Sequence, residues 1–468
     1  MKKFLKITLS LLLFVVTGYF IYKQHKKTAV LVNKIHVDAV SVLKVGIHDL
    51  KETLVLDVIS SPTFYWDAVS FSDNKKEKDT IQKEGIGIDL TPYALVFYTM
   101  EGIKNTLFIT IEVDDSELFQ KYITNYIKEK GLKAHTLHTG YSYVTNSKSK
   151  MVFAWNKQKL AVAISTEINE EKYKSVFEDV LIKNTLITDK NHVYVKTLKN
   201  ASDHIVYLSK ENKVTINFRD GEAVLKGVFF TEKPQKYYSE VTYEATPNAS
   251  LQLYFDANFE NKHNRKEFIK NIEGNSFFKN NNIDVTSFAN RTNGFLYMGI
   301  KGTTIQEDTI VTYTYNDNFD KIAQKTIQEK KVPKIVLNFG SEDESLKNYL
   351  KKQGVIKNNV LTAVPYYTFY TKEDVMKTSF ETEKKNQKTQ KRLSNSFFNL
   401  EVDFSSLKND IEIPQTKDFF SLVNKLSVVA NQLEKNKVDL KGKLTTTNKK
   451  VNVLSHLFFG IRKKYSLK

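Results

Sequence analysis

A seven-residue block that occurs twice limits the possible folds of this chain more than any other feature. Residues 88–94 read IDLTPYA and residues 283–289 read IDVTSFA. Four of the seven positions are identical, two are conservative exchanges, and Pro92 against Ser287 is the one clear difference. Both blocks lead into apolar, strand-like segments. The repetition predicts a building block that the chain uses at least twice.

The segments around the two blocks also correspond. Each unit is expected to read strand, helix, two strands and a helix. In the two copies the matched segments are strands within 36–50 and 246–259, LVFYTM at 95–100 and FLYMGI at 295–300, TLFITIEV at 106–113 and TIVTYTYN at 309–316, and closing helices at 115–130 and about 318–330. This order predicts an α+β fold in which helices pack on one face of a mainly antiparallel sheet.

A partial third copy is expected from residues 395–407, followed by a helix at 418–434 and two closing strands, KVDLKGKLTTT and KVNVLSHLFFG. The polar, basic stretch before it lacks apolar periodicity and is interpreted as a linker or loop. The expected organisation is a cytoplasmic tail and signal-anchor helix at 1–27, a first α+β repeat domain at 30–235, a second at 236–380, the linker at 381–394 and the third unit at 395–468.

Short local signals predict several turns and helix ends. Asp220-Gly221 is typical of a hairpin turn, and a second hairpin is expected near Asn156-Lys157. Ser341 precedes Glu344 by three residues, a capping-box spacing that predicts a helix start there and a stop at Gly354.

The amino terminus has the pattern of a membrane-targeting segment. Lys2, Lys3 and Lys6 precede an uncharged run at 7–22, and further lysines follow it. The run ends in bulky residues, which favours an uncleaved signal anchor over a cleaved signal peptide. The short tail favours a cytoplasmic amino terminus and a single-pass arrangement, with residues 30–468 in the periplasm and membrane lipid as the first expected partner.

Composition narrows the chemistry. The 468 residues include no cysteine, which excludes disulfides, thiolate metal sites, a cysteine nucleophile and a lipidated cysteine. Lys and Arg outnumber Asp and Glu by 70 to 53, and the net charge of +17 favours anionic cell-envelope surfaces or envelope proteins as partners. Nearly all of the basic residues are lysines, whereas readers of nucleic acid rely on arginine, so nucleic acid is disfavoured as a partner.

The stretch GIGIDLTPYALVFY contains the one pattern that suggests a nucleotide site. Gly85 and Gly87 could begin a phosphate-binding loop, but such a loop needs a third glycine at the start of a helix, and a strand-like segment follows here. The second copy has Asn281 and Asn282 in place of the glycines. Four side chains of the two blocks are therefore interpreted as turn-forming groups that bond local backbone: Asp89, Thr91, Asp284 and Thr286.

No other pattern predicts a catalytic, cofactor or metal site. His135 and His138 are spaced so that a strand would point them to opposite faces, which disfavours chelation. Acidic clusters stand where helices are expected to start and the helix dipole favours them: Asp114, Asp115 and Glu117, Glu170 and Glu171, and Glu342, Asp343 and Glu344. Aromatic groups could stack on a glycan, but alternation favours a place in the core: Phe64-Tyr65-Trp66, Tyr366-Tyr367 and Phe369-Tyr370.

The segments DAVSVLKVGIHDL, LDVISSPTFYW, GIDLTPYALVFY and GYSYV, with the hairpin AWNKQKLAVA, resemble a family of large bacterial envelope proteins that are often lipoproteins. The likeness covers mainly residues 35–165 and more loosely 245–330. It implies an envelope location and repeated α+β architecture. It brings no catalytic residues, because the family has no established active site. This chain differs from the lipoprotein members because it has no cysteine to carry the lipid.

These features predict a membrane-anchored extracytoplasmic envelope protein with a binding or scaffolding role rather than an enzyme. The alternative is an envelope hydrolase with its site in a cleft between repeats.

Overall fold

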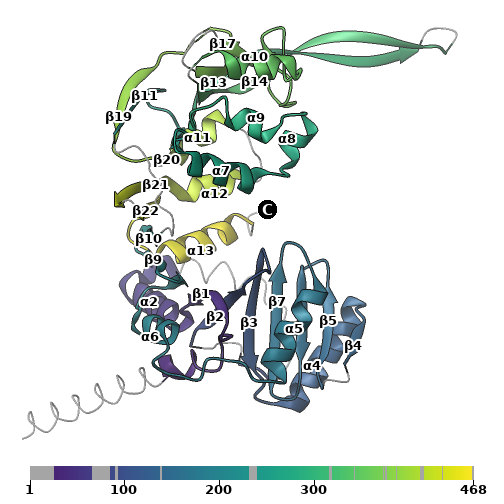
Figure 1. Ribbon diagram of the computed structural model, residues 1–468, viewed down its shortest axis with the longest axis vertical. Coiled ribbons are helices and arrows are strands. Elements are labelled where there is room, and N and C mark those ends of the chain that lie inside the picture. The colour runs from purple at the N-terminus through teal and green to yellow at the C-terminus, as the bar shows by residue number, and fades with distance from the viewer. Residues whose placement is uncertain are drawn as a thin grey trace, which may run out of the picture. The chain divides into compact units, whose positions relative to one another are not determined.

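The computed structural model describes residues 26–65, 85–89, 93–137, 140–230, 240–315, 319–341, 343–372, 374, 377–385, 387–411, 416–434 and 436–465. The chain divides into two compact units, residues 1–217 and 218–468 (Figure 1). This division does not test whether segments 30–235, 236–380 and 395–468 fold as separate domains, and that expectation stays a prediction.

The first unit is a twisted antiparallel sheet with the strand order β9-β8-β1-β2-β3-β7-β6-β5-β4. Its elements are β1 (Ala39–Val45), α2 (Ile47–Ser60), β2 (Leu95–Met100), β3 (Thr106–Glu112), α4 (Ser116–Lys130), β4 (Ala134–Thr136), β5 (Ser142–Asn146), β6 (Met151–Trp155), β7 (Lys159–Ser165), α5 (Glu170–Leu181), α6 (Val193–Asn200), β8 (Ile205–Ser209) and β9 (Asn212–Arg219).

Side chains from the same strands enter two separate cores. Tyr98 and Phe108 join α5 and α6 in one apolar cluster, whereas Phe97 and Ile109 join α4 in another. Because successive strand residues point to opposite faces, these helices cover both faces of the sheet. The expected packing of helices on one face is therefore wrong for this unit.

The second unit contains a sheet in the order β10-β22-β21-β20-β12-β13-β14-β18-β17-β16-β15, with β11 and β19 as a separate pair. Its strands are β10 (Glu222–Phe230), β11 (Val241–Ala245), β12 (Leu251–Asp256), β13 (Phe295–Tyr315), β14 (Lys321–Gly340), β15 (Ile356–Lys357), β16 (Val360–Leu361), β17 (Phe369–Lys372), β18 (Lys377–Glu381), β19 (Gln390–Ser394), β20 (Phe398–Asp403), β21 (Val423–Glu434) and β22 (Lys437–Thr446). Its helices are α7 (Lys262–Ile272), α8 (Ser276–Asn280), α9 (Val285–Ala289), α10 (Ser345–Lys352), α11 (Phe404–Asp410), α12 (Lys417–Leu422) and α13 (Val453–Tyr465).

The expected fold class, a transmembrane anchor followed by repeated sheet units, needs correction. Apart from β11 and β19, the described strands of each unit form one continuous hydrogen-bonded sheet. The repeated units do not each form their own sheet, because β12 in the second copy pairs with β20 in the partial third copy. No helix among the described residues is long and apolar enough to cross a membrane. The segment expected to be the anchor, residues 7–22, lies outside the described residues.

Turn signals located several elements correctly. The hairpin at Asp220-Gly221 joins β9 to β10, and Gly221 has a φ of 68°. The hairpin near Asn156-Lys157 joins β6 to β7, and the helix expected at 115–130 is α4. Helix α10 stops at Gly354 as predicted, but it begins at Ser345 rather than after Ser341, and the side chain of its N-cap residue makes no capping hydrogen bond.

Four segments have a different structure from the one expected. The helix at 318–330 is strand β14, the carboxyl part of the helix at 418–434 is strand β21, and the closing strand KVNVLSHLFFG is mainly helix α13. Part of the linker at 381–394 is strand β19, which pairs with β11. In the first two cases and in β19, pairing with other strands outweighs the local pattern.

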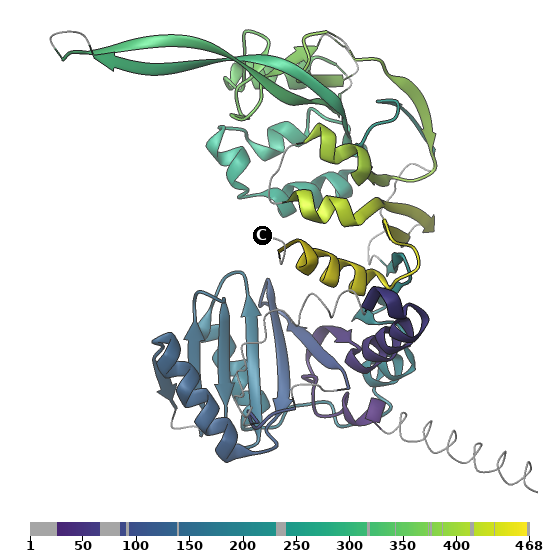
Figure 2. The ribbon, with the colours of Figure 1, turned by 180° about the vertical axis from the view of Figure 1, so that it is seen from behind.

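Strands β13 and β14 leave the rest of the second unit as a long two-stranded ribbon (Figures 1 and 2). A bulge between Ile300 and Thr303 separates the ribbon from the inner parts of the two strands, which pair with β12 and β18. We call residues 303–315 and 321–333, which lie beyond this bulge, the arm.

Candidate functional site

The Gly85-Ile86-Gly87 sequence lies against the start of helix α4. The carbonyl oxygen of Gly87 accepts hydrogen bonds from the backbone N–H groups of Asp114 and Asp115, at 2.9 and 3.2 Å. Gly87 has a φ of 73°, and a Cβ atom there would lie 2.3 Å from the carbonyl oxygen of Asp115. This position therefore requires glycine for its backbone conformation and for its close approach to the helix.

The amino end of helix α4 is closed to an anion. The Asp115 side chain accepts hydrogen bonds from the backbone N–H groups of Glu117 and Leu118, both at 3.0 Å. A phosphate would need those same N–H groups, and it would meet the Asp115 carboxylate beside them. The capped helix thus supports the interpretation that the glycines form structural backbone.

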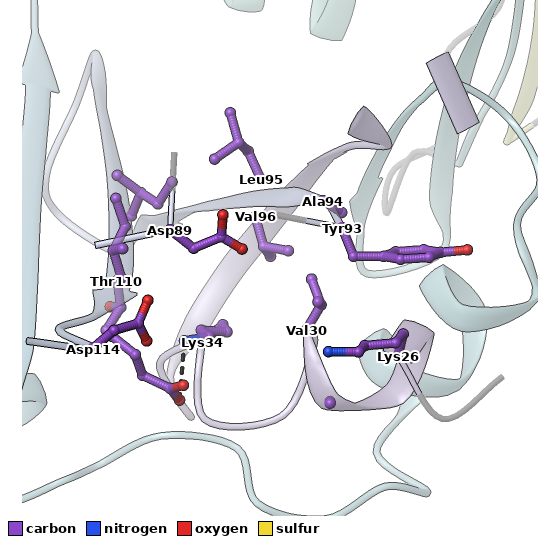
Figure 3. A pocket seen from close by; sticks show the side chains of 14 residues that line it. Lys26, Val30, Lys34, Asp89, Tyr93, Ala94, Leu95, Val96, Thr110 and Asp114 are labelled. Carbon is purple, nitrogen blue, oxygen red and sulfur yellow. Dashed lines mark ion pairs between the residues drawn. The ribbon is translucent and has the colours of Figure 1, made fainter. Parts of the chain in front are cut away.

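A cavity of about 310 Å³ lies beside this junction in the first unit (Figure 3). Asp89 comes from the first repeated block and Asp114 from the end of β3, while Lys26 belongs to a helical turn on the other side. Apolar side chains, among them Val30 and Val96, form the wall between these charged groups. The remaining lining residues are Ala29, Lys34, Tyr93, Ala94, Leu95, Ile109, Thr110, Ile111 and Glu112.

Two of the charged residues that line this cavity form an ion pair. The ammonium of Lys34 lies 3.0 Å from Glu112, and Glu112 faces Lys159 across the β3–β7 pair. Burial lowers the pKa of Lys159, and the nearby Lys34 lowers it further, while Glu112 opposes both effects. The ring of Tyr93 stacks on the ring of His48, with centroids 4.5 Å apart. The arrangement can hold a small polar molecule, but the lining residues include no histidine or serine that could act as a base and nucleophile pair.

The second block has a different local structure. Asp284 is the N-cap of α9, and its carboxylate accepts the backbone N–H of Ser287 at 2.7 Å. This hydrogen bond is the main cause of a lowered pKa at Asp284. Asn282 has a φ of 54°, so the residue before the block is left-handed in both copies. The expectation that Asp284 forms a local turn bond is confirmed, whereas Thr91 lies outside the described residues.

The acidic clusters stand at helix starts, as expected. Glu117 lies in the first turn of α4, Glu170 and Glu171 lie in the first turn of α5, and Glu344 precedes α10. Asp343 accepts the backbone N–H of Ser345 at 2.8 Å, so it performs the capping role that the spacing had assigned to Ser341. Glu342 lies outside the described residues.

The histidine and aromatic candidates are dispersed. His135 is exposed on β4 and stacks on Tyr143, with ring centroids 5.1 Å apart, and His138 lies outside the described residues. Within the described part of the chain, no group of three His, Asp or Glu side chains is placed to hold a metal ion. Tyr65 is buried and its hydroxyl donates to Asp57, while Trp66 lies outside the described residues.

The aromatic pairs near residue 370 are split between core and surface. Phe369 is buried, in agreement with the prediction, whereas Tyr366 is among the most exposed apolar side chains. The ammonium of Lys330 lies 3.4 Å from the Tyr366 carbonyl oxygen and 5.9 Å from the centre of the Tyr367 ring. These contacts tie the base of the arm to the loop before β17.

A second cavity, of about 630 Å³, lies in the second unit. Lys377 lies 2.6 Å from Glu244 and 3.3 Å from Asp374, so its charge is already compensated. Asp256 is buried beside them, and burial raises the pKa of its carboxyl. The cavity is lined by acidic side chains, and the ammonium of Lys377 compensates part of their charge.

Several exposed apolar side chains lie on the arm. Ile305, Val311, Tyr313 and Ile327 share one face of the ribbon, according to its register, and all four are exposed. Phe319, next to the tip, is 84% exposed. Beyond the bulge, no strand of the described residues pairs with the outer edge of β13 or of β14.

Sequence reasoning missed the arm because it assigned a helix to 318–330. The signal that could have revealed the arm is the density of threonine and β-branched residues on both sides of a short polar segment, from Thr303 to Tyr315 and again from Ile322 to Val332.

The comparisons with known proteins add little to this geometry. No protein-family model matches the chain, and no curated protein matches it in sequence. Two solved structures, crystal forms IV and III of TP0453, resemble part of it at 9% and 8% identity. They cover 41% and 42% of this chain and 76% of that chain, with TM-scores of 0.23 and 0.24. Likenesses of this extent carry no argument about fold or function.

Proposed function

We propose that the chain is an extracytoplasmic protein of the cell envelope that acts by binding or scaffolding. The location rests on the amino-terminal sequence, in which lysines precede the uncharged run at 7–22, as they do in export signals. The role rests on the arm, a ribbon whose apolar face and two strand edges are open.

The arm supports a binding role because an isolated two-stranded ribbon is at best marginally stable in water. Its anchorage is confined to the base, where the buried Gln306 side chain donates to the carbonyl oxygens of Thr368 and Thr382, each at 2.7 Å. Past this point, every β14 residue from Lys325 to Lys331 is exposed. Unpaired strand edges and exposed apolar side chains are the features through which proteins add a strand from a partner.

The hydrolase alternative receives no comparable support. The lining of the cavity beside Asp89 contains no histidine or serine, and in the cavity beside Asp256 the ammonium of Lys377 lies 2.6 Å from Glu244. We therefore prefer the binding role.

Site-specific photocrosslinking tests this proposal in the cells that produce the protein. A photoreactive amino acid replaces Phe319 or Ile327 on the arm, and it replaces Val193, an exposed residue of helix α6, as the matched control. We expect a discrete protein adduct from the two arm positions and none from the control. Equal labelling at all three positions, or no adduct from the arm, would contradict a binding role for the arm.

A further inference from the structure

The open edge of β14 carries both basic and acidic side chains, and their order along the strand limits what can pair with it. The exposed edge residues include Lys321, Lys325 and Glu329, followed by Lys330 and Lys331. The outer part of β13 bears acidic residues but no basic ones, since its only charged side chains beyond the bulge are Glu307 and Asp308. Only the β14 edge can therefore offer both signs of charge to a second copy of itself.

Antiparallel geometry allows few registers for such self-pairing. Along a strand, alternate residues point their backbone N–H and C=O groups to opposite edges. Two residues that face each other in an antiparallel pair must both point these groups toward the partner strand or both away from it. When a strand pairs with its own copy, this condition is met only if the two-fold axis passes through a residue and not between two residues. Centring on Lys325, Glu329 or Lys330 sets that charge against itself. Centring on Thr326 opposes Lys321 to Lys331, and centring on Gln328 opposes Lys325 to Lys331.

Centring on Ile327 gives the complementary arrangement. Lys325 of each copy then faces Glu329 of the other, so two opposite-charge pairs form across one interface, with Ile327 facing Ile327 between them. Centring on Gln324 places Lys321 opposite Ile327 and forms no ion pair. The register about Ile327 is therefore the one of these that joins opposite charges and opposes no like charges.

We propose that the arm binds a second copy of this chain, through antiparallel pairing of the two β14 edges from Ala323 to Lys331 and centred on Ile327. The inference deepens the proposed binding role and rests on it. The pairing would give each arm a neighbour along the edge that is open in the single chain, and it forms a two-fold symmetric contact that closes on itself.

The charge of the arm argues against a lipid surface as the occupant. Residues 303–333 contain four lysines and five acidic residues, which gives a net charge of 4 − 5 = −1. Anionic headgroups attract clusters of basic residues, so a ribbon of this composition gains nothing from them. A strand of another protein remains as a distinct outcome of the test.

Charge reversal tests the register in the purified full-length chain. The mass of the chain in mild detergent is followed by sedimentation over a range of concentrations. Lys325→Glu and Glu329→Lys should each weaken the dimer about tenfold or more, because each turns two attractive pairs into repulsive ones. The double variant should restore the dimer. Lys301→Glu makes the same change of charge on β13, away from the β14 edge, and should leave the dimer intact.

The two single variants also separate the contact between copies from the stability of the arm itself. Glu329 faces Glu307 within the ribbon, so Glu329→Lys should strengthen the arm while it weakens the dimer. A loss of dimer in both single variants that the double variant reverses cannot come from a misfolded arm.

Single cysteines test the centre of the register, since the natural chain has none. In Ile327→Cys the two thiols face each other and should oxidise to a disulfide-linked dimer. In Ala323→Cys each thiol faces Lys331 of the other copy, and no disulfide-linked dimer should form on oxidation.

Three results would overturn self-pairing: a monomer at every concentration, a dimer that survives both charge reversals, or crosslinking of Cys variants at 323 as rapid as at 327. If the photocrosslinked adducts of the arm contain a different protein and the purified chain is monomeric, the binding role stands and self-pairing fails. If the arm gives no adduct at all, the binding role itself fails.

Discussion

The two hairpins that follow the repeated blocks have different surroundings. Strands β2 and β3 are six and seven residues long, and both lie inside the sheet of the first unit, between β1 and β7. Strands β13 and β14 are 21 and 20 residues long, and only their inner ends have neighbours beyond the hairpin. The two segments matched as separate strands thus form the core hairpin β2–β3 in the first copy, whereas in the second copy 295–300 and 309–315 lie on the single strand β13, which continues into the arm.

The difference teaches where strand structure comes from. In β3, Phe108 is 1% exposed and its ring lies 5.8 Å from that of Tyr98, so burial and aromatic packing stabilise the pair. In the arm, the closest ring contact is the ammonium of Lys321, 4.1 Å from the centre of the exposed Tyr313 ring. The arm keeps its strand conformation through the β13–β14 ladder and local propensity, and its side chains remain available to a partner.

Alanine substitution in the two hairpins should give the largest contrast. Phe108→Ala removes a ring packed against Tyr173 and Phe177 and should cost about 3–5 kcal/mol of unfolding free energy. Tyr313→Ala removes one exposed ring and should cost less than about 1 kcal/mol. Urea unfolding followed by tryptophan fluorescence reports on the first unit, because both tryptophans, Trp66 and Trp155, belong to it. The second unit is followed by amide hydrogen exchange.

The comparison breaks if Tyr313→Ala destabilises the isolated chain as strongly as Phe108→Ala does. That result would mean that the Tyr313 side chain packs against other residues of the same chain and is not available to a partner.

The residue before each block should give a smaller contrast. Gly87→Ala forces a Cβ atom against the Asp115 carbonyl and should cost on the order of 2–4 kcal/mol, through left-handed strain and crowding. In Asn282→Ala the alanine must adopt the left-handed backbone conformation, and this strain should lower the free energy of unfolding by about 1–2 kcal/mol. Tryptophan fluorescence measures the first variant, and hydrogen exchange of α9 measures the second. Equal costs would show that contact with helix α4 contributes nothing to the requirement for glycine.

The sequence predicted the turns at glycine correctly, but it did not predict which segments pair as strands. Asp220-Gly221 and Gly354 act through the conformation of one or two residues, so their neighbours suffice to predict them. Strand β21 has apolar residues at helical spacing, but it lies between β20 and β22, and their ladders decide its structure. The same holds for 318–330, which pairs with the outer part of β13.

The candidate site was predictable in part for the same reason. The cap formed by Asp284 follows from local spacing, whereas the cavity beside Asp89 assembles Lys26, Asp114 and β2 from separate segments. The edge of β14 is open because strand β18 pairs only with its inner part, from Val336 to Gly340. The local sequence of β14 does not indicate where this pairing stops.

The smallest expected effect lies at the Asp284 cap, and its dependence on pH identifies the cause. Asp284→Ala removes the acceptor for the Ser287 N–H and should cost about 1 kcal/mol at pH 7. Because the pKa of Asp284 is lowered in the folded state, its ionised form favours folding above the unfolded pKa, near 4, and this contribution is lost as the pH falls through the folded pKa. The cost of Asp284→Ala should therefore shrink as the pH falls below about 4, as measured by hydrogen exchange or circular dichroism. Asp284→Asn keeps an acceptor and should show a small cost at every pH. An Asp284→Ala cost that stays constant down to pH 2 would mean that the carboxylate acts by shape alone, and the second block would then lack the capping role that sets it apart from the first.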